Sequence, residues 1–221
     1  MKNFIIACSF CSFTLFSCGP KNETETAVTD NNMGDSNRVD TTGISAEVPI
    51  MDSAKMMENW ASYMTPGDMQ KMMSGWSGNW KQEVTVWETP GGAPQSSLGR
   101  SENKMVMGGR YQQSMTTGKM MGKPFNGLST LAFDKGSNTF INTWIDNMGT
   151  GMMILKGTWD DATKSINLSG NIVDPASGNG NTVPIRESFH IIDDNTQLME
   201  MFGPSHDGKE FKMMEIKMTR M

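Results

Sequence analysis

The spacing of turn-forming residues constrains this chain more than any other feature of its sequence. From Gly78 onward, clusters of Gly, Asn, Asp and Pro recur about every 10 to 14 residues, with apolar and polar residues alternating between them. Such alternation is typical of strands with one buried face, and evenly spaced turns favour an antiparallel barrel or sandwich. The pattern predicts ten strands, at residues 79–87, 99–107, 109–117, 125–134, 138–145, 151–159, 164–173, 182–192, 196–203 and 209–219.

A single closed sheet accommodates these strands best. Closing a sheet into a barrel removes the exposed edges that would otherwise pair with other chains. We therefore expect a mainly β fold, a closed antiparallel barrel of about ten strands over residues 76–221. The alternation changes phase in the last strand, between Met213 and Met214, which predicts a β-bulge there.

A short helical lead-in, residues 51–75, is predicted before the barrel. Apolar residues three and four apart indicate a helix over residues 52–64 with one apolar face, made of Met56, Met57, Trp60, Tyr63 and Met64. Asp52 or Ser53 can cap its start. Thr65 is expected to cap a second helix that Pro66 opens and that continues to about Ser74.

The N-terminus has the pattern of an export signal. A short basic start that contains Lys2 precedes an almost uncharged apolar run from Phe4 to Phe16, which is shorter than the roughly 20 residues of a transmembrane helix. The segment Leu15-Phe16-Ser17-Cys18-Gly19 resembles the lipobox of bacterial lipoproteins, although that pattern prefers a small residue at Phe16. The resemblance implies cleavage of residues 1–17, lipidation of Cys18 and a lipid anchor in the bacterial envelope, as an outer-membrane lipoprotein facing the periplasm or the surface. The alternative is an ordinary signal peptide in which Cys18 is incidental.

Residues 18–50 are predicted to form a disordered tether between the lipid and the folded domain. They are rich in Asn, Thr, Glu and Asp and nearly free of large apolar side chains. Cys8 and Cys11 leave with the signal, so Cys18 is the remaining cysteine, and the mature chain can form neither an internal disulfide nor a thiolate metal site. The formal charge of −5, about −6 after cleavage, argues against nucleic acid as a partner. We expect a monomer.

Several segments between Thr65 and Arg220 together carry a family resemblance. They are Gly78-Asn79-Trp80, Trp87-Glu88-Thr89-Pro90-Gly91-Gly92, Met107-Gly108-Gly109-Arg110-Tyr111, Met121-Gly122-Lys123-Pro124-Phe125-Asn126-Gly127, the run from Thr143 to Gly151, and the run from Met214 to Arg220. In this order they resemble an uncharacterised bacterial family of secreted domains of unknown function with a lipocalin-like, calycin-type β-barrel. The resemblance implies a fold and a compartment but no reaction. Family members often carry a His in the short helix before the first strand, where this chain has Gln70.

The resemblance also implies how one end of the barrel is closed. In calycins a Gly-x-Trp on the first strand closes an end, and an Arg from the end of the last strand packs across the indole. Gly78, Trp80 and Arg220 stand at these positions. A guanidinium over an indole contributes roughly 0.5–2 kcal/mol, so the expected role of these residues is structural.

No convincing catalytic constellation emerges, and the sequence predicts neither an enzyme nor a cofactor. A catalytic triad needs a His between an acid and a nucleophile, but the chain has only His190 and His206 and lacks a Gly-x-Ser-x-Gly elbow. His190 could ligate haem iron, although a lone strand His is more often solvated or hydrogen-bonded. A carboxylate pair for glycoside hydrolysis could be drawn from four acids, which by default are exposed: Asp146, Asp160, Glu187 and Glu200.

Methionine is unusually abundant, with 23 residues. Soft thioethers select Cu(I) or Ag(I), so metal buffering is an alternative function. Adjacent methionines on a strand point to opposite faces, however, so pairs such as Met152-Met153 do not form a chelate. Met also fills irregular apolar gaps and adapts to varied ligands, and no metal site is predicted.

Ligand binding inside the barrel is the leading functional hypothesis. Phe140, Asn142, Trp144 and Asp146 alternate along one predicted strand and would present apolar wall and polar anchor on one face. Barrels of this size can hold a small apolar molecule. The sequence therefore favours binding of a small hydrophobic or amphipathic ligand. In the alternative, this face is ordinary core and the protein is a structural or interaction module of the envelope.

Overall fold

A computed structural model describes residues 52–221 of the chain. The predicted signal peptide, the lipidation site Cys18 and the predicted tether lie outside the described residues. Two helices come first, α1 (Ser53–Met64) and α2 (Asp68–Ser74). Ten strands follow: β1 (Gly78–Val86), β2 (Gln95–Val106), β3 (Tyr111–Met120), β4 (Lys123–Asp134), β5 (Thr139–Asp146), β6 (Met153–Asp160), β7 (Ser165–Val173), β8 (Thr182–Asp193), β9 (Thr196–Pro204) and β10 (Glu210–Arg220). A short 3₁₀ helix, η1 (Pro175–Ser177), lies between β7 and β8.

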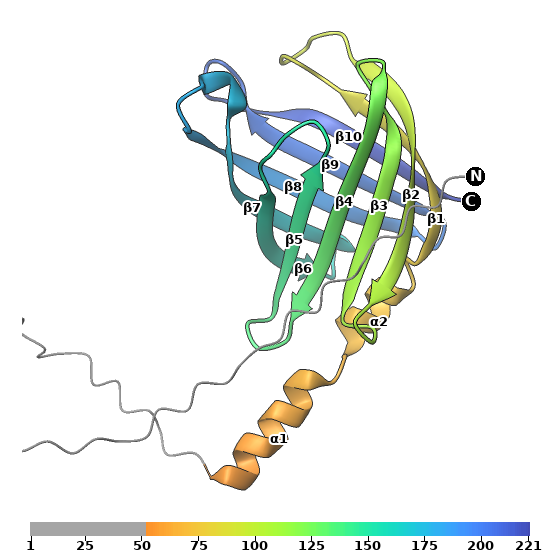
Figure 1. The fold of residues 1–221 in the computed structure, drawn as a ribbon, viewed down its shortest axis with the longest axis vertical. Coiled ribbons are helices and arrows are strands. Elements are labelled where there is room, and N and C mark those ends of the chain that lie inside the picture. The colour runs from red at the N-terminus through yellow and green to blue at the C-terminus, as the bar shows by residue number, and fades with distance from the viewer. Residues whose placement is uncertain (1–51) are drawn as a thin grey trace, which may run out of the picture. The chain divides into compact units, whose positions relative to one another are not determined.

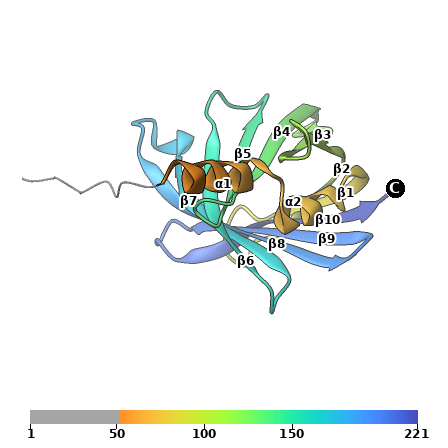
Figure 2. The same ribbon diagram turned by 90° about the horizontal axis from the view of Figure 1, so that it is seen from below.

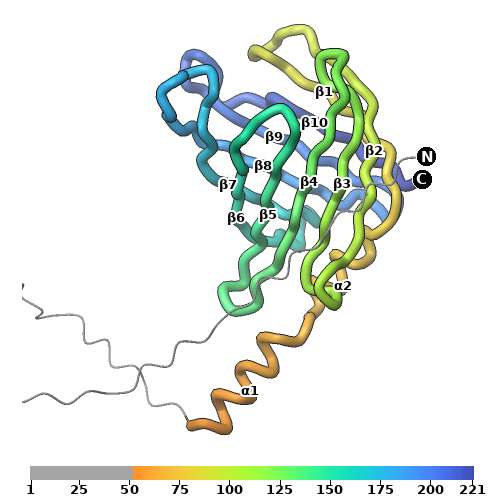
Figure 3. Tube along the Cα trace, viewed as in Figure 1, coloured from red at the N-terminus to blue at the C-terminus, as the bar shows by residue number. Residues whose placement is uncertain are grey.

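The strands form one closed antiparallel barrel, which confirms the predicted fold class. Each strand pairs with its neighbours in sequence, and β1 closes the sheet against β10 (Figure 1). Figure 3 follows the chain through the successive hairpins. The predicted bulge is confirmed, since the register between β9 and β10 shifts between Lys212 and Met214.

Several predicted boundaries differ from the structure; the second strand, for example, begins at Gln95 rather than at residue 99. Two further differences have local reasons. The third strand begins at Tyr111 rather than at residue 109, because Met107, Gly108 and Gly109 all have positive φ and form the turn. The second helix begins after Gly67, not at Pro66. The Thr65 hydroxyl instead donates to the carbonyl of Ala61 and ends α1, while the Gly67 amide donates to the Gln70 side chain.

The helix α2 covers one end of the barrel, which we call the closed end (Figure 2). Helices leave their last carbonyls without partners in the helix itself. Here barrel side chains supply donors: Gln112 Nε2 donates to the Met73 carbonyl at 2.6 Å, and Trp80 Nε1 donates to the Trp76 carbonyl at 3.0 Å. The helix is thereby bonded to the inner face of the sheet.

Arg220 joins the two ends of the folded chain at the same place. Its guanidinium lies 4.4 Å from the centroid of the Trp80 ring and donates to the carbonyls of Gly75 and Ser77. Gly78 has a φ of 126°, and a Cβ there would come 3.1 Å from the Arg220 Nη1 atom. A side chain at position 78 would therefore strain the backbone and crowd the guanidinium.

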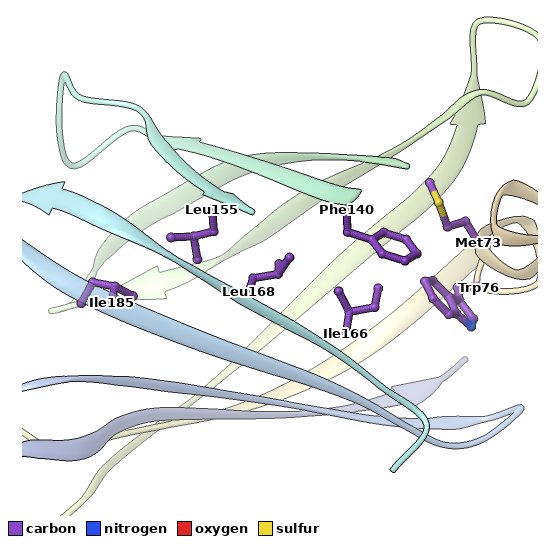
Figure 4. Packing of buried hydrophobic residues seen from close by; sticks show 7 residues of the cluster. All are labelled: Met73, Trp76, Phe140, Leu155, Ile166, Leu168 and Ile185. Carbon is purple, nitrogen blue, oxygen red and sulfur yellow. The ribbon is translucent and has the colours of Figure 1, made fainter. Parts of the chain in front are cut away.

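The apolar core runs from α2 into the barrel. Figure 4 shows its seven buried side chains as a continuous group: Met73, Trp76, Phe140, Leu155, Ile166, Leu168 and Ile185. Met73 and Trp76 come from the helical segment, so the lead-in contributes to the same core as the strands.

The helix α1 differs from α2 because it buries none of its residues. Asp52 caps it, accepting from the Ala54 amide, and Lys135 Nζ donates to the carbonyls of Ser62 and Thr65 at its other end. Its apolar face stays exposed, with Met57 at 71% and Trp60 at 56%. In the part of the chain that the structure describes, no helix has the length and apolarity needed to cross a membrane.

The contacts of Arg220 predict that it stabilises the barrel. Replacing it by Met removes the ring contact and three hydrogen bonds, and we expect the free energy of unfolding to fall by about 2 kcal/mol. Chemical denaturation followed by tryptophan fluorescence measures this loss. Arg100→Met, which changes an exposed arginine on β2, is the control; an equal loss in both variants would contradict the prediction.

Candidate functional site

The inside of the barrel has two chemically different sides. Directly paired residues of antiparallel strands share a face, so the inward positions follow from the ladders. Trp80 pairs with Ser101 and Ser101 with Thr116, all three of them buried. The polar inward residues gather on β1–β4, beside apolar ones such as Val84, Met105 and Leu131. We call these polar residues the polar wall: Gln82, Ser101, Asn103, Gln112, Ser114, Thr116 and Ser129.

The inward side of β6–β10 is the apolar wall. Its members are Met153, Leu155, Ile166, Leu168, Ile185, Phe189, Met199, Met201, Met214 and Ile216. Inward residues on both walls, such as Ser114, Ser129, Met199 and Ile216, are only partly buried. Part of the surface of these inward residues therefore stays accessible. We call this inner space the lumen.

Unpaired polar atoms collect on the inside of β9, β1 and β2. Gln197 is fully buried, and neither its amide nitrogen nor its amide oxygen has a hydrogen-bond partner within the described chain. The same holds for Gln82 Oε1, Ser101 Oγ and Asn103 Oδ1. A buried polar atom without a partner costs about 1–3 kcal/mol, so these groups lower the stability of the folded barrel.

The four candidate ligand residues on β5 all face inward, but they differ in surroundings. Phe140 is fully buried and packs on Phe133 with 4.8 Å between ring centroids, so it belongs to the core. Asn142 is also buried, and its side-chain oxygen accepts from the Ser129 hydroxyl at 2.6 Å. It thus joins the polar wall to β5.

Trp144 and Asp146 lie further along β5, away from α2. The indole packs so closely on Gly127 that a Cβ there would come within 2.3 Å of it, and Phe125 stacks on the ring at 6.2 Å. Trp144 Nε1 donates to Asp146 at 2.8 Å, and the same carboxylate accepts from the Met148 and Gly149 amides. These bonds hold the indole and the following turn in place. They engage both carboxylate oxygens of Asp146.

Glu187 is the most unusual group of the interior. It lies between Ile185 and Phe189 on β8 and pairs with Leu168 on β7 and Met201 on β9, so it stands within the apolar wall. It is 6% exposed, and across residues 52–221 its carboxyl has neither a hydrogen bond nor an ion pair. Burial alone raises the pKa of Glu187 from 4.5 to about 7.

The remaining candidate groups lie outside the lumen. His190 faces outward, with Nε2 3.5 Å from Glu200, which also pairs with Lys212 at 3.0 Å. A haem inside the barrel is therefore out of reach of His190. His206 is exposed in the turn before β10, and Asp160 faces outward and caps the turn after β6.

The methionine pairs separate as the strand geometry predicts. Met152 is 60% exposed, whereas Met153 packs against the core. Among residues 52–221 no three His, Cys, Asp or Glu side chains form a metal-binding group. Thioether binding of Cu(I) or Ag(I) stays an untested alternative.

The sequence pattern predicts that Glu187 faces inward, although an acidic residue is by default expected to be exposed. In the strand 182–192 it is in phase with Ile185 and Phe189, which makes it the one acid on an apolar face. The unpaired amides of Gln82 and Gln197 gave no comparable signal, since their burial depends on which strands become neighbours.

Comparison with known proteins agrees with this fold. The family model for a protein of unknown function, DUF1579, matches residues 65–220. The crystal structure of Rv2717c from M. tuberculosis is similar with a TM-score of 0.52 at 14% identity, over 71% of this chain and 99% of that chain. A redesigned beta barrel, b11L5F_LGL, aligns with a TM-score of 0.36 at 14% identity, over 70% of this chain and 99% of that one. No curated protein matches the sequence. At such low identity the likeness to Rv2717c supports the fold alone.

The raised pKa of Glu187 predicts a pH-dependent stability. The folded state holds the proton more tightly than the unfolded state, so the free energy of unfolding falls as pH rises from 4.5 to about 7. Between pH 5 and pH 8 we expect this group to cost roughly 2–3 kcal/mol. Glu187→Gln cannot ionise and should lose that decline.

Chemical denaturation at both pH values measures the difference. The control is Glu102→Gln, which removes an exposed, outward-facing carboxylate from β2. An unchanged decline with pH in Glu187→Gln would show that the carboxyl is not held in an apolar environment.

Proposed function

The chain belongs to the DUF1579 family, whose function is unknown, and we propose that it binds a small amphipathic molecule in the lumen of its barrel. The observation that carries this proposal is the division of the interior into two walls. A chain that needed only a stable core would not benefit from buried amides without partners, because each one costs free energy.

An amphipathic ligand matches both walls at once. Its polar part would meet polar side chains of the interior, and its apolar part would cover the aliphatic and thioether side chains. Ligand pockets commonly combine an apolar lining with a few polar groups that orient the ligand. The partly accessible inward side chains supply surface for such a contact.

The methionines of the apolar wall favour a ligand of variable shape. Met153, Met199, Met201 and Met214 present flexible thioethers to the lumen. Unbranched side chains with a polarisable sulfur can repack around different apolar bodies. We therefore expect the lumen to bind amphipathic molecules of different shapes rather than one particular molecule.

We also propose that the protein works as a lipid-anchored component of the bacterial envelope, through Cys18. The support comes from the lipobox-like segment Leu15–Gly19 and the basic and apolar residues before it. Several acyl chains on one N-terminus suffice for stable anchoring.

Fluorescence of the neutral probe N-phenyl-1-naphthylamine tests lumen binding. We expect its emission to rise on titration into the protein and to fall when decan-1-ol displaces it. Ser114→Phe places a ring in the lumen from the inward side of β3 and should weaken probe binding about tenfold or more, since it occupies the ligand's space.

Thr117→Phe is the matched control, because Thr117 is exposed and faces outward on the same strand. Equal binding by both variants would place the probe outside the barrel. No binding by the wild type would remove the proposal.

The anchor is tested separately by metabolic labelling with a clickable fatty acid in a bacterial host. The full chain should carry the label and partition into detergent. Cys18→Ser should lose the label, whereas Ser17→Ala, which keeps a small residue before the cysteine, should retain it. Label in the Cys18→Ser variant would contradict anchoring at this residue.

A further inference from the structure

We infer that the ligand of the lumen is an organic cation, an amine on an apolar body, and that the Glu187 carboxylate binds it. This inference rests on the proposed lumen function and names the chemical class that the site selects. Its starting point is the position of a single carboxyl, buried in an apolar wall and without any partner in residues 52–221.

The side chains around Glu187 provide neither a hydrogen-bond donor nor a positive charge. Leu168 on β7 and Met201 on β9 pair with it directly, and Ile185 and Phe189 flank it on β8. None of these side chains donates a hydrogen bond or carries a charge. A buried carboxylate is costly unless it is paired, so this position gains most from a partner that arrives from the lumen.

The wall opposite Glu187 is also free of charge. In a closed sheet of ten strands, β3 is five strands away from β8 in either direction, and its inward residues are Gln112, Ser114 and Thr116. They are hydrogen-bonding but neutral. These three residues therefore present no cation that would compete with a ligand for the carboxylate.

The other charged groups near the lumen are already occupied. Asp146 accepts from Trp144 and two backbone amides, and Arg220 lies over Trp80 at the closed end with three carbonyl partners. The outward neighbours of Glu187 on its own strand do not face it: Arg186 pairs with Glu210, and Ser188 donates to Asn167. Glu187 is thus the one charge that is buried in the inner wall of the described barrel without a partner.

Ligand chemistry follows from these surroundings. A primary ammonium donates hydrogen bonds and brings the missing positive charge, and the aliphatic and thioether side chains beside Glu187 cover an attached hydrocarbon. A hydrogen bond to a charged partner contributes more than one between neutral groups, and a tenfold change in affinity corresponds to about 1.4 kcal/mol. A neutral alcohol of equal length lacks this gain.

Displacement of N-phenyl-1-naphthylamine by decylamine and by decan-1-ol, two ligands of equal chain length, tests the inference at pH 8. The wild type should bind decylamine roughly tenfold more tightly than decan-1-ol. Glu187→Gln should bind the two about equally, and Glu187→Asp should keep part of the preference. Glu102→Gln loses the same formal charge on the outer face of β2 and should behave as the wild type, which excludes general attraction by an acidic protein.

The pH profile gives a second measurement. Alkyl ammonium groups stay protonated below about pH 10, as lysine does, so the carboxyl is the group that titrates. Since the pKa of Glu187 is about 7, decylamine affinity should rise between pH 6 and pH 8 by about fivefold, while decan-1-ol affinity should not rise.

The outcomes separate the two proposals. If decan-1-ol and decylamine bind the wild type equally, or if Glu187→Gln keeps the preference for the amine, the inference about Glu187 is wrong and lumen binding stands. If neither ligand displaces the probe and the probe itself does not bind, lumen binding fails.

Discussion

The hydrogen bonds between the barrel and the carbonyls that follow α2 are the interactions on which the rest of the structure depends. A seven-residue helix is too short to be stable by itself. It is kept in place because Gln112, Trp80 and Arg220 donate to the carbonyls at and beyond its last turn, from strands β3, β1 and β10. The same bonds close one end of the sheet, orient Trp76 into the core and leave the lumen with polar groups on one side. The cap at the closed end and part of the polar wall are thus built from the same contacts.

This arrangement explains why polar side chains occupy so much of the interior. Gln112 is satisfied by the helix, and Asn142 by Ser129, but Gln82 and Gln197 have no comparable partner. A barrel core of aliphatic residues would avoid the free-energy cost of burying these polar groups. Buried amides and one buried carboxyl make physical sense when the interior is completed by a further molecule, as the proposed function requires.

Much of the fold was predictable, because alternation and turn spacing are local properties. All ten strands were anticipated, and the phase change at Met213-Met214 located the bulge. The predicted start of α2 was wrong because the Thr65 hydroxyl donates to a carbonyl of α1 instead of capping α2. The sequence allows either hydrogen bond. The site was only half predictable: alternation placed Phe140, Asn142, Trp144 and Asp146 on one face, but separating core from lumen required their neighbours on β4. The sequence offers Glu187 as one of four acids, and its isolation depends on the apolar residues that β7 and β9 place beside it.

The contacts of Arg220 also bear on the order in which the domain folds. The acceptors on Gly75 and Ser77 and the donor on Arg220 stand more than 140 residues apart, at the two ends of the barrel sequence. Contacts of such long range form late, because the loop that they close is the whole domain. A partially synthesised chain has strands and turns but no β10 to pair with β1, and its cap lacks the guanidinium. Until β10 pairs with β1, the sheet therefore keeps two open edges, which can pair with other chains.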